Sequence, residues 1–168
     1  RHPAVLAKMA ATVDQVSGGR VVLGLGAGWQ ENEHTAYGIE LPPVKERLDR
    51  FEEAVQVIKG LLTEEHFSFS GDHYTITNAP MNPKRADMPI LIGGGGEKRT
   101  MKIAAKYADE WNIWSTPEIM KPKLDILRKH CDDVGRSFDD IHISTQALLF
   151  MSDDQSFLEN MRNNQLPM

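Results

Sequence analysis

Apolar residues recur at helical spacing in four segments of the chain. The clearest segment lies between residues 44 and 62, where apolar positions follow one another at alternating intervals of four and three. This period predicts an amphipathic helix and leaves little room for a strand. The positions are Val44, Leu48, Phe51, Val55, Ile58 and Leu62.

The same spacing predicts three further helices. The first begins at Pro3, a residue suited to a first helical position, and stops at Gly18-Gly19. The second covers residues 97–108, and the third covers residues 117–134 with Thr116 as its cap. The apolar positions of the first helix are Leu6, Met9, Val13 and Val16.

Short apolar runs between the helices predict buried strands. They are rich in β-branched and aromatic residues, which is typical of strands covered on both faces. Residues 66–77 alternate on both sides of Ser70-Gly71-Asp72 and predict a β-hairpin inserted between the main units. The four runs are residues 20–25, 88–92, 111–114 and 141–151.

The alternation of helix and strand predicts an α/β fold with parallel strands joined by right-handed crossovers. Two arrangements remain open, an open doubly wound sheet and part of a closed (β/α)8 barrel. A complete barrel needs eight strands and about 250 residues, so the barrel interpretation requires strands missing at both ends. The chain has 168 residues and begins with Arg1 rather than Met, so we expect residues 1–168 to be one partial domain cut from a longer chain.

Composition narrows the class of protein. With 40% hydrophobic and 26% charged residues the chain is typical of a globular domain. A net charge of −5 with scattered basic residues disfavours nucleic-acid binding. No apolar run approaches the roughly 18 residues of a membrane span, and residues 1–8 do not form a signal sequence, so we expect a cytoplasmic protein. Cys131 is the only cysteine and the histidines lack ligand spacing, so no metal site is expected.

The strongest candidate site is the run Gly93, Gly94, Gly95 and Gly96, which joins a predicted strand to a predicted helix. Without Cβ atoms, such residues let backbone N–H groups approach a phosphate at a positive helix end. Arg99 and Thr100 could add a charge and a hydroxyl; the alternative is a flexible turn. The run matches neither the dinucleotide nor the Walker fingerprint, and Gly24–Trp29 also fails the dinucleotide pattern.

A second candidate is the loop Trp29–His34, which follows the carboxyl end of a predicted strand, where α/β enzymes place their chemistry. Glu33 and His34 could instead form an ion pair on the surface. Trp111 and Trp114 flank a short strand, and packing is favoured over cofactor stacking for both.

Three segments together resemble the luciferase-like flavin and deazaflavin oxidoreductases. They are residues 1–20, residues 22–34 with the sequence VLGLGAGWQENEH, and residues 89–100 with PILIGGGGEKRT; the likeness continues through YAD at 107–109 and Trp111-Asn112. The resemblance covers most of residues 1–150. It implies a (β/α)8 barrel with an inserted hairpin, in which the predicted strands are about the fourth to the seventh.

The resemblance also implies a coenzyme and a site. Family members hold the coenzyme's phosphate on backbone amides after the fifth strand, which here corresponds to Gly93–Gly96, with Gly95 and Gly96 the best-aligned pair. Asn32 aligns with an asparagine that contacts the deazaflavin in some relatives. The family's sugar-phosphate dehydrogenases carry an acidic residue where this chain has Trp29, so that substrate is not expected and the catalytic residues stay unknown.

We therefore expect hydride transfer between the deazaflavin coenzyme F-420 and a small organic substrate. One alternative is an FMN-dependent monooxygenase that activates oxygen, since phosphate binding by the glycines suits both coenzymes. An alternative of another class is a non-catalytic partial domain or ligand-binding module. Whether the protein forms a homodimer stays open.

Overall fold

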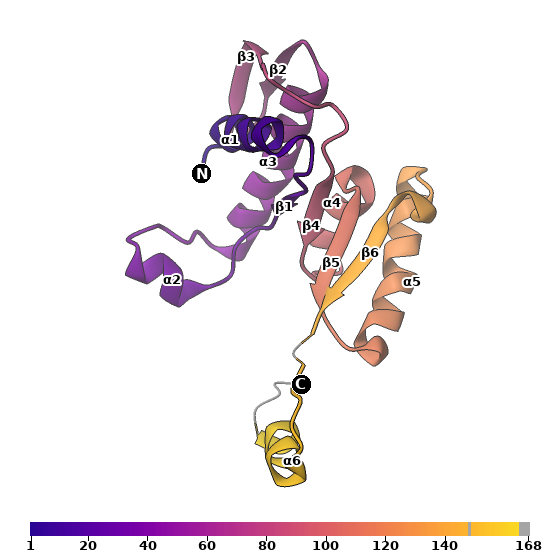
Figure 1. The fold of residues 1–168 in the computed structure, drawn as a ribbon. Helices are drawn as coiled ribbons and strands as arrows, with labels where there is room; N and C mark the ends of the chain where they lie inside the picture. The colour runs from indigo at the N-terminus through magenta and orange to yellow at the C-terminus, as the bar shows by residue number, and fades with distance from the viewer. Residues whose placement is uncertain (148, 165–168) are drawn as a thin grey trace.

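A computed structural model describes residues 1–147 and 149–164, and its centre is a parallel sheet (Figure 1). The sheet has four strands in the order β1-β4-β5-β6, and every neighbouring pair is parallel. The strands are β1 (Leu23–Leu25), β4 (Ile90–Gly93), β5 (Glu110–Trp114) and β6 (His142–Gln146).

The strand order follows the chain without a reversal. A doubly wound sheet reverses its strand order at a switch point, whereas neighbouring strands of a barrel wall follow in sequence. The described sheet is therefore arranged like a segment of a barrel wall, and β1 and β6 form its two edges. The (β/α)8 barrel itself is not closed by the described residues.

Six α-helices accompany the two sheets in the described chain. α4 and α5 contact each other, α4 contacts β4, and α1 lies across α3 (Figure 1). The helices are α1 (Pro3–Ser17), α2 (Glu31–Ala36), α3 (Val44–Thr63), α4 (Thr100–Tyr107), α5 (Pro117–Val134) and α6 (Gln155–Asn164), and a short 3-10 helix covers Phe138–Asp140.

The helix predicted from Pro3 is confirmed as α1, and Gly18 ends it with a left-handed φ of 71°. The face that it buries differs from the expected one. The buried positions are mainly small, whereas Met9, Val13 and Val16 are exposed. Alanine allows α1 to approach α3 closely, so the small residues, and not the larger apolar ones, form the contact. The buried residues of α1 are Pro3, Ala7, Ala10, Ala11 and Asp14.

The strand predicted over residues 20–25 is shorter in the structure, because a partly buried ion pair takes up the backbone groups of Val21. The Val21 N–H donates to Asp14 Oδ1 at 3.1 Å, and Arg85 Nη2 donates to the Val21 carbonyl at 3.1 Å. Arg85 also donates to both carboxylate oxygens of Asp14, at 2.8 and 3.0 Å. These bonds replace the ladder bonds, so β1 starts only at Leu23.

The predicted hairpin is confirmed as β2 (His66–Ser70) and β3 (Thr75–Pro80), an antiparallel pair. Its turn is fixed by Glu53 of α3, whose carboxylate accepts the N–H groups of Asp72, His73 and Tyr74 at 2.8 to 3.0 Å. A carboxylate that accepts several backbone N–H groups makes charge-assisted hydrogen bonds, which are stronger than neutral ones. The hairpin is therefore anchored to α3.

The helix predicted over residues 97–108 does not follow the strand directly. β4 ends at Gly93, and α4 begins only at Thr100, so Gly94–Arg99 form a loop. Gly94 has a φ of 123°, and the Met101 N–H donates to the Gly96 carbonyl at 3.0 Å. The chain reaches a helical conformation only after this wide turn.

Three further predictions need correction at their ends. The last strand, predicted over residues 141–151, covers only His142–Gln146, and position 148 lies outside the described residues. Thr116 occupies the N-cap of α5, but its side chain makes no capping hydrogen bond. The segment predicted as a polar loop after Gly28 contains α2.

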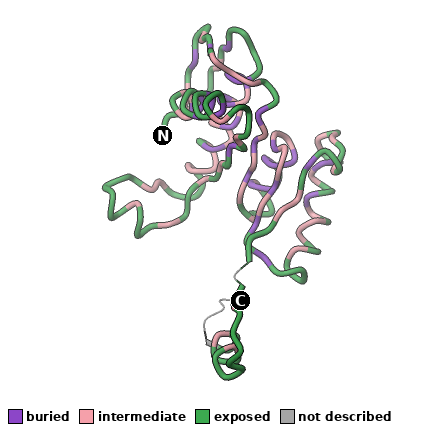
Figure 2. The backbone as a smooth tube through the Cα atoms, in the orientation of Figure 1, coloured by how far each residue is buried: buried purple, intermediate pink, exposed green. Residues whose placement is uncertain are grey.

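The core lies between the sheet, α3, α4 and α5 (Figure 2). Ile92 and Trp111 are fully buried on the sheet, and Leu127 and Cys131 of α5 cover them together with α4. The α2 segment and α6 are mostly exposed (Figure 2). Within the described residues, no helix is long and apolar enough to cross a membrane.

The ion pair predicts acid-sensitive folding. Hydrogen bonding from Arg85 holds the pKa of Asp14 below its usual value, against the opposing effect of burial. The stabilisation is therefore fully present above the unfolded pKa of about 3.9 and is lost as the pH falls through the lower folded pKa. In urea unfolding, Asp14→Asn should be less stable than wild type at pH 7. The difference should shrink between pH 4 and pH 2, since protonation removes the same charge; a gap that is constant with pH would contradict this.

Candidate active site at the glycine loop

The site is built from the loop that follows β4. Gly93 is the last residue of this strand and pairs with Asn112 of β5 in the parallel register. The Gly94 N–H donates to the Asn112 carbonyl at 2.9 Å, so this amide belongs to the sheet. The loop leaves the sheet after Gly94, at the carboxyl end of the strand.

Two side chains hold the carbonyls of this loop. Trp111, which has no exposed surface, donates its indole N–H to the Gly94 carbonyl at 3.0 Å. Lys123 of α5 donates its ammonium group to the Gly95 carbonyl at 3.0 Å and forms an ion pair of 2.6 Å with Glu97. Both donors come from the side of the sheet that α4 and α5 cover.

The two contacts fix the direction of the next amides. In a trans peptide unit the C=O and N–H bonds point in opposite directions. Because the carbonyls of Gly94 and Gly95 turn toward Trp111 and Lys123, the N–H groups of Gly95 and Gly96 turn away from them. The charge of Lys123 also polarises the peptide that it contacts, which strengthens the N–H of Gly96 as a donor.

Neither N–H group has a partner. Across residues 1–147 and 149–164, the amides of Gly95 and Gly96 donate to no acceptor. Gly95 is half-buried and Gly96 is exposed, so an approaching ligand can reach both. Two neighbouring unpaired N–H groups before the first turn of a helix form an arrangement that binds anions.

In the structure, Thr100 lies next to the glycines, whereas the Arg99 guanidinium points toward α3. Thr100 is 9% exposed, and its Oγ1 lies 2.8 Å from the position that a Cβ on Gly96 would occupy. Arg99 forms ion pairs with α3, at 2.7 Å to Asp49 and 3.7 Å to Glu52. Its guanidinium is therefore engaged by two carboxylates and does not contact the glycine loop.

Asn32 is likewise not brought to the glycines. It lies exposed on α2, in a segment that projects away from the sheet (Figure 1). Trp29, which precedes this helix, is 80% exposed. The Glu33–His34 ion pair is not formed; the His34 ring lies 2.9 Å from the Gln30 carbonyl instead. The predicted role of Asn32 therefore stays a prediction.

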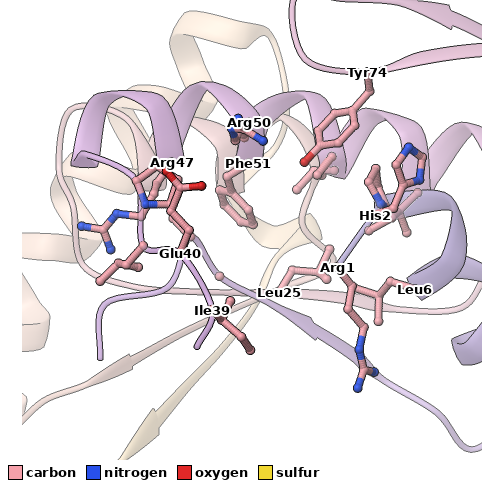
Figure 3. A pocket seen from close by; sticks show the side chains of 18 of the residues that line it. Arg1, His2, Leu6, Leu25, Ile39, Glu40, Arg47, Arg50, Phe51 and Tyr74 are labelled. Atoms are coloured by element: carbon pink, nitrogen blue, oxygen red, sulfur yellow. The ribbon is translucent and has the colours of Figure 1, made fainter. Parts of the chain in front are cut away.

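A cleft of about 550 Å³ lies elsewhere in the described chain (Figure 3). It lies between the start of α1, the residues after β1 and the first half of α3, and Gly93–Gly96 do not line it. Arg50 and Phe51 of α3 face it, and the Tyr74 ring stands edge-on to His2 with centroids 5.4 Å apart. The glycine loop and this cleft are therefore separate candidate sites.

The part of the chain that the structure describes contains no group of three or more His, Cys, Asp or Glu residues placed to hold a metal ion. Burial raises the pKa of the Cys131 thiol, which lies on the buried face of α5. A raised pKa keeps a thiol protonated and unreactive, so Cys131 fits a role in the core.

Comparison with known proteins decides the family. Residues 1–165 match the model of a family described as luciferase-like monooxygenase. The chain belongs to this family. The relatives described in the next two paragraphs are named as dehydrogenases or monooxygenases, so this family is one of enzymes.

The curated relatives use two kinds of coenzyme. An F420-dependent glucose-6-phosphate dehydrogenase of Kineococcus radiotolerans is 33% identical over 166 residues, which are 96% of this chain and 49% of the relative. An FMNH(2)-dependent dimethylsulfone monooxygenase of Pseudomonas fluorescens is 33% identical over 129 residues, which are 76% of this chain and 35% of the relative. This luciferase-like chain thus spans between about a third and a half of these relatives' length.

A solved structure supports the same placement. An F420-dependent secondary alcohol dehydrogenase in complex with an F420-acetone adduct superimposes with a TM-score of 0.74 at 29% identity, covering 85% of this chain and 44% of that protein. The arrangement of the parallel strands is therefore shared with this F420-dependent dehydrogenase.

Sequence reasoning misses the two side chains that orient the loop. The sequence favours packing for Trp111, which its burial supports, but its indole N–H also holds the Gly94 carbonyl. Lys123 carries no signal in the sequence, since one lysine on a long amphipathic helix is ordinarily solvated. A tryptophan inside a short buried strand is the one available clue, because a buried indole N–H usually needs an acceptor.

The Trp111 contact predicts a specific loss of stability. Trp111→Phe keeps an aromatic ring but removes the N–H donor and some volume from a fully buried position, so the free energy of unfolding should fall by about 1–3 kcal/mol. Trp114→Phe is the matched control, because Trp114 is 61% exposed, and its effect should stay within about 0.5 kcal/mol. Urea unfolding of both variants measures this, and equal effects would contradict the proposed contact.

Proposed function

We propose that this protein is an oxidoreductase that transfers a hydride between the deazaflavin coenzyme F-420 and a small organic substrate. The coenzyme's phosphate would bind to the N–H groups of Gly95 and Gly96, with the Thr100 hydroxyl beside them. When bound, the deazaflavin supplies the hydride chemistry, and the residues of the chain bind and orient it. The catalytic acid or base is not assigned.

One observation carries this proposal: two adjacent amides are unpaired and are turned to one side by contacts on their own peptide units. The indole of Trp111 and the ammonium group of Lys123 hold two successive carbonyls of the loop and so fix the direction of both amides. A phosphate oxygen is an acceptor that suits these donors, and hydrogen bonds to a charged group contribute about 1.5–3 kcal/mol each.

The choice of coenzyme rests on the relatives. The F420-dependent relative matches almost the whole chain, and the solved F420-dependent alcohol dehydrogenase shares its fold at 29% identity. The second candidate is an FMN-dependent monooxygenase that consumes oxygen, which the equal identity of the dimethylsulfone monooxygenase favours. Both coenzymes carry a phosphate, so the glycine loop suits either.

We further propose that residues 1–168 act as part of a larger barrel domain. The edges of the sheet, β1 and β6, lack a neighbouring strand within the described residues. Exposed edges are sites of further strand pairing, and a barrel removes them by closure. Activity would then belong to the domain as a whole.

A direct comparison of the two coenzymes tests the function. We expect full-length protein to bind F-420, which is measured by a change in the absorbance of the coenzyme. We also expect the concentration of dissolved oxygen to stay unchanged. Oxygen consumption with reduced FMN, together with no response to F-420, would overturn the deazaflavin assignment in favour of the monooxygenase.

Two neighbouring glycines supply matched variants for the same experiment. In Gly96→Ala the new Cβ would lie 2.8 Å from Thr100 Oγ1, so either the Thr100 side chain or the loop must shift. In Gly95→Ala the nearest atom is 3.7 Å away, an ordinary contact. Losing one charge-assisted bond predicts roughly 10- to 100-fold weaker coenzyme binding for Gly96→Ala and a smaller loss for Gly95→Ala. Equal binding by both variants would count against the site.

A further inference from the structure

The sheet face opposite α4 and α5 carries a row of polar side chains on β5 and β6. Alternation along β5 places Trp111 and Ile113 in the core and turns Glu110 and Asn112 to the other face, where both are half-buried. In the parallel register Asn112 pairs with Ser144. A polar pair on this face is unusual for a barrel wall, whose interior positions are mostly bulky and branched.

The hydrogen bonds in this row have a single possible direction. The Ser144 hydroxyl donates its one proton to Glu110 Oε1. The Ser144 oxygen can then only accept, and Asn112 must present its NH2 group, which donates at 2.7 Å. The orientation of the Asn112 amide is therefore fixed, and its Oδ1 points away from Ser144.

Asn112 Oδ1 is a free acceptor. In residues 1–147 and 149–164 no group donates to it, and it is not among the buried polar atoms that lack a partner, so it remains accessible. The position paired with Asn112 on β4 is Gly93, which has no side chain. That position of β4 therefore places no side chain beside this oxygen.

The glycine loop begins at the same level of the sheet. Neighbouring strands lie about 4.8 Å apart and a strand rises about 3.3 Å per residue, so Asn112 lies within roughly 10 Å of the unpaired amides of Gly95 and Gly96. A group joined to a phosphate on those amides by a few single bonds can reach Asn112 Oδ1. The group must be a hydrogen-bond donor, because this oxygen can only accept.

We propose that Asn112 Oδ1 accepts a hydrogen bond from a hydroxyl of a polyol chain whose phosphate ester binds at Gly95 and Gly96. Both F-420 and FMN carry such a chain next to the phosphate. Asn112 is then a binding residue for the coenzyme, and Ser144 and Glu110 are positioning residues that orient its amide. This inference rests on the proposed function.

Binding of two kinds of probe to full-length protein tests the proposal. The coenzymes FMN and F-420 carry the polyol phosphate, whereas inorganic phosphate has no polyol chain. Asn112→Ala should weaken binding of the coenzyme by about tenfold and leave binding of inorganic phosphate unchanged, since one hydrogen bond is lost and the amides remain. Calorimetric titration gives both dissociation constants without any dependence on turnover.

Two variants sharpen the test. Ser144→Ala removes the acceptor that orients the Asn112 amide and should weaken coenzyme binding by about threefold, again without an effect on phosphate. Thr145→Val is the matched control on the same strand, because the Thr145 hydroxyl bonds to the Ile113 carbonyl on the covered side and should not affect binding of either probe.

The outcomes separate this inference from the proposed function. Wild-type protein that binds neither the coenzymes nor phosphate would overturn both. Wild-type protein that binds FMN or F-420, with Asn112→Ala binding it equally well, would overturn only the role of Asn112. Parallel losses for coenzyme and phosphate would show that Asn112 supports the loop itself, which also contradicts the proposal.

Discussion

The orientation of two peptide units between Gly94 and Gly96 is the constraint on which this site depends. A peptide plane is rigid, so a donor that holds the carbonyl on one side commits the N–H to the other. Trp111 and Lys123 supply these donors from β5 and α5. The packing of β5 and α5 therefore determines the direction in which the loop after β4 presents its amides. The core and the candidate site thus depend on the same contacts.

The two ends of the parallel strands have different roles, one in binding and the other in stability. The glycine loop lies at the carboxyl ends, whereas the Asp14–Arg85 pair joins α1 to the segment before β4 at the amino ends. In barrels the carboxyl ends carry chemistry and the opposite ends carry stability. The ion pair holds Val21, just before β1, and so shortens the strand. Charge-assisted hydrogen bonds to Val21 replace the regular strand pairing at this position.

Local patterns predict the elements well, and long-range contacts account for the differences. The apolar rhythm from Val44 to Leu62 corresponds to α3 almost to the residue. The predicted start of β1 is wrong because Arg85, 64 residues away, binds the Val21 carbonyl. The glycine run can be recognised from its sequence, but its orientation depends on Trp111 and Lys123, which are 17 and 28 residues from their partners.

The amides of Gly95 and Gly96 provide the most direct test. In a titration of isotopically labelled full-length protein, the account predicts that FMN, F-420 and inorganic phosphate all shift the amide proton resonances of these two residues downfield, whereas riboflavin, which has no phosphate, does not. Resonances that stay in place while residues of the Arg50 cleft respond to the phosphate-bearing ligands would contradict it.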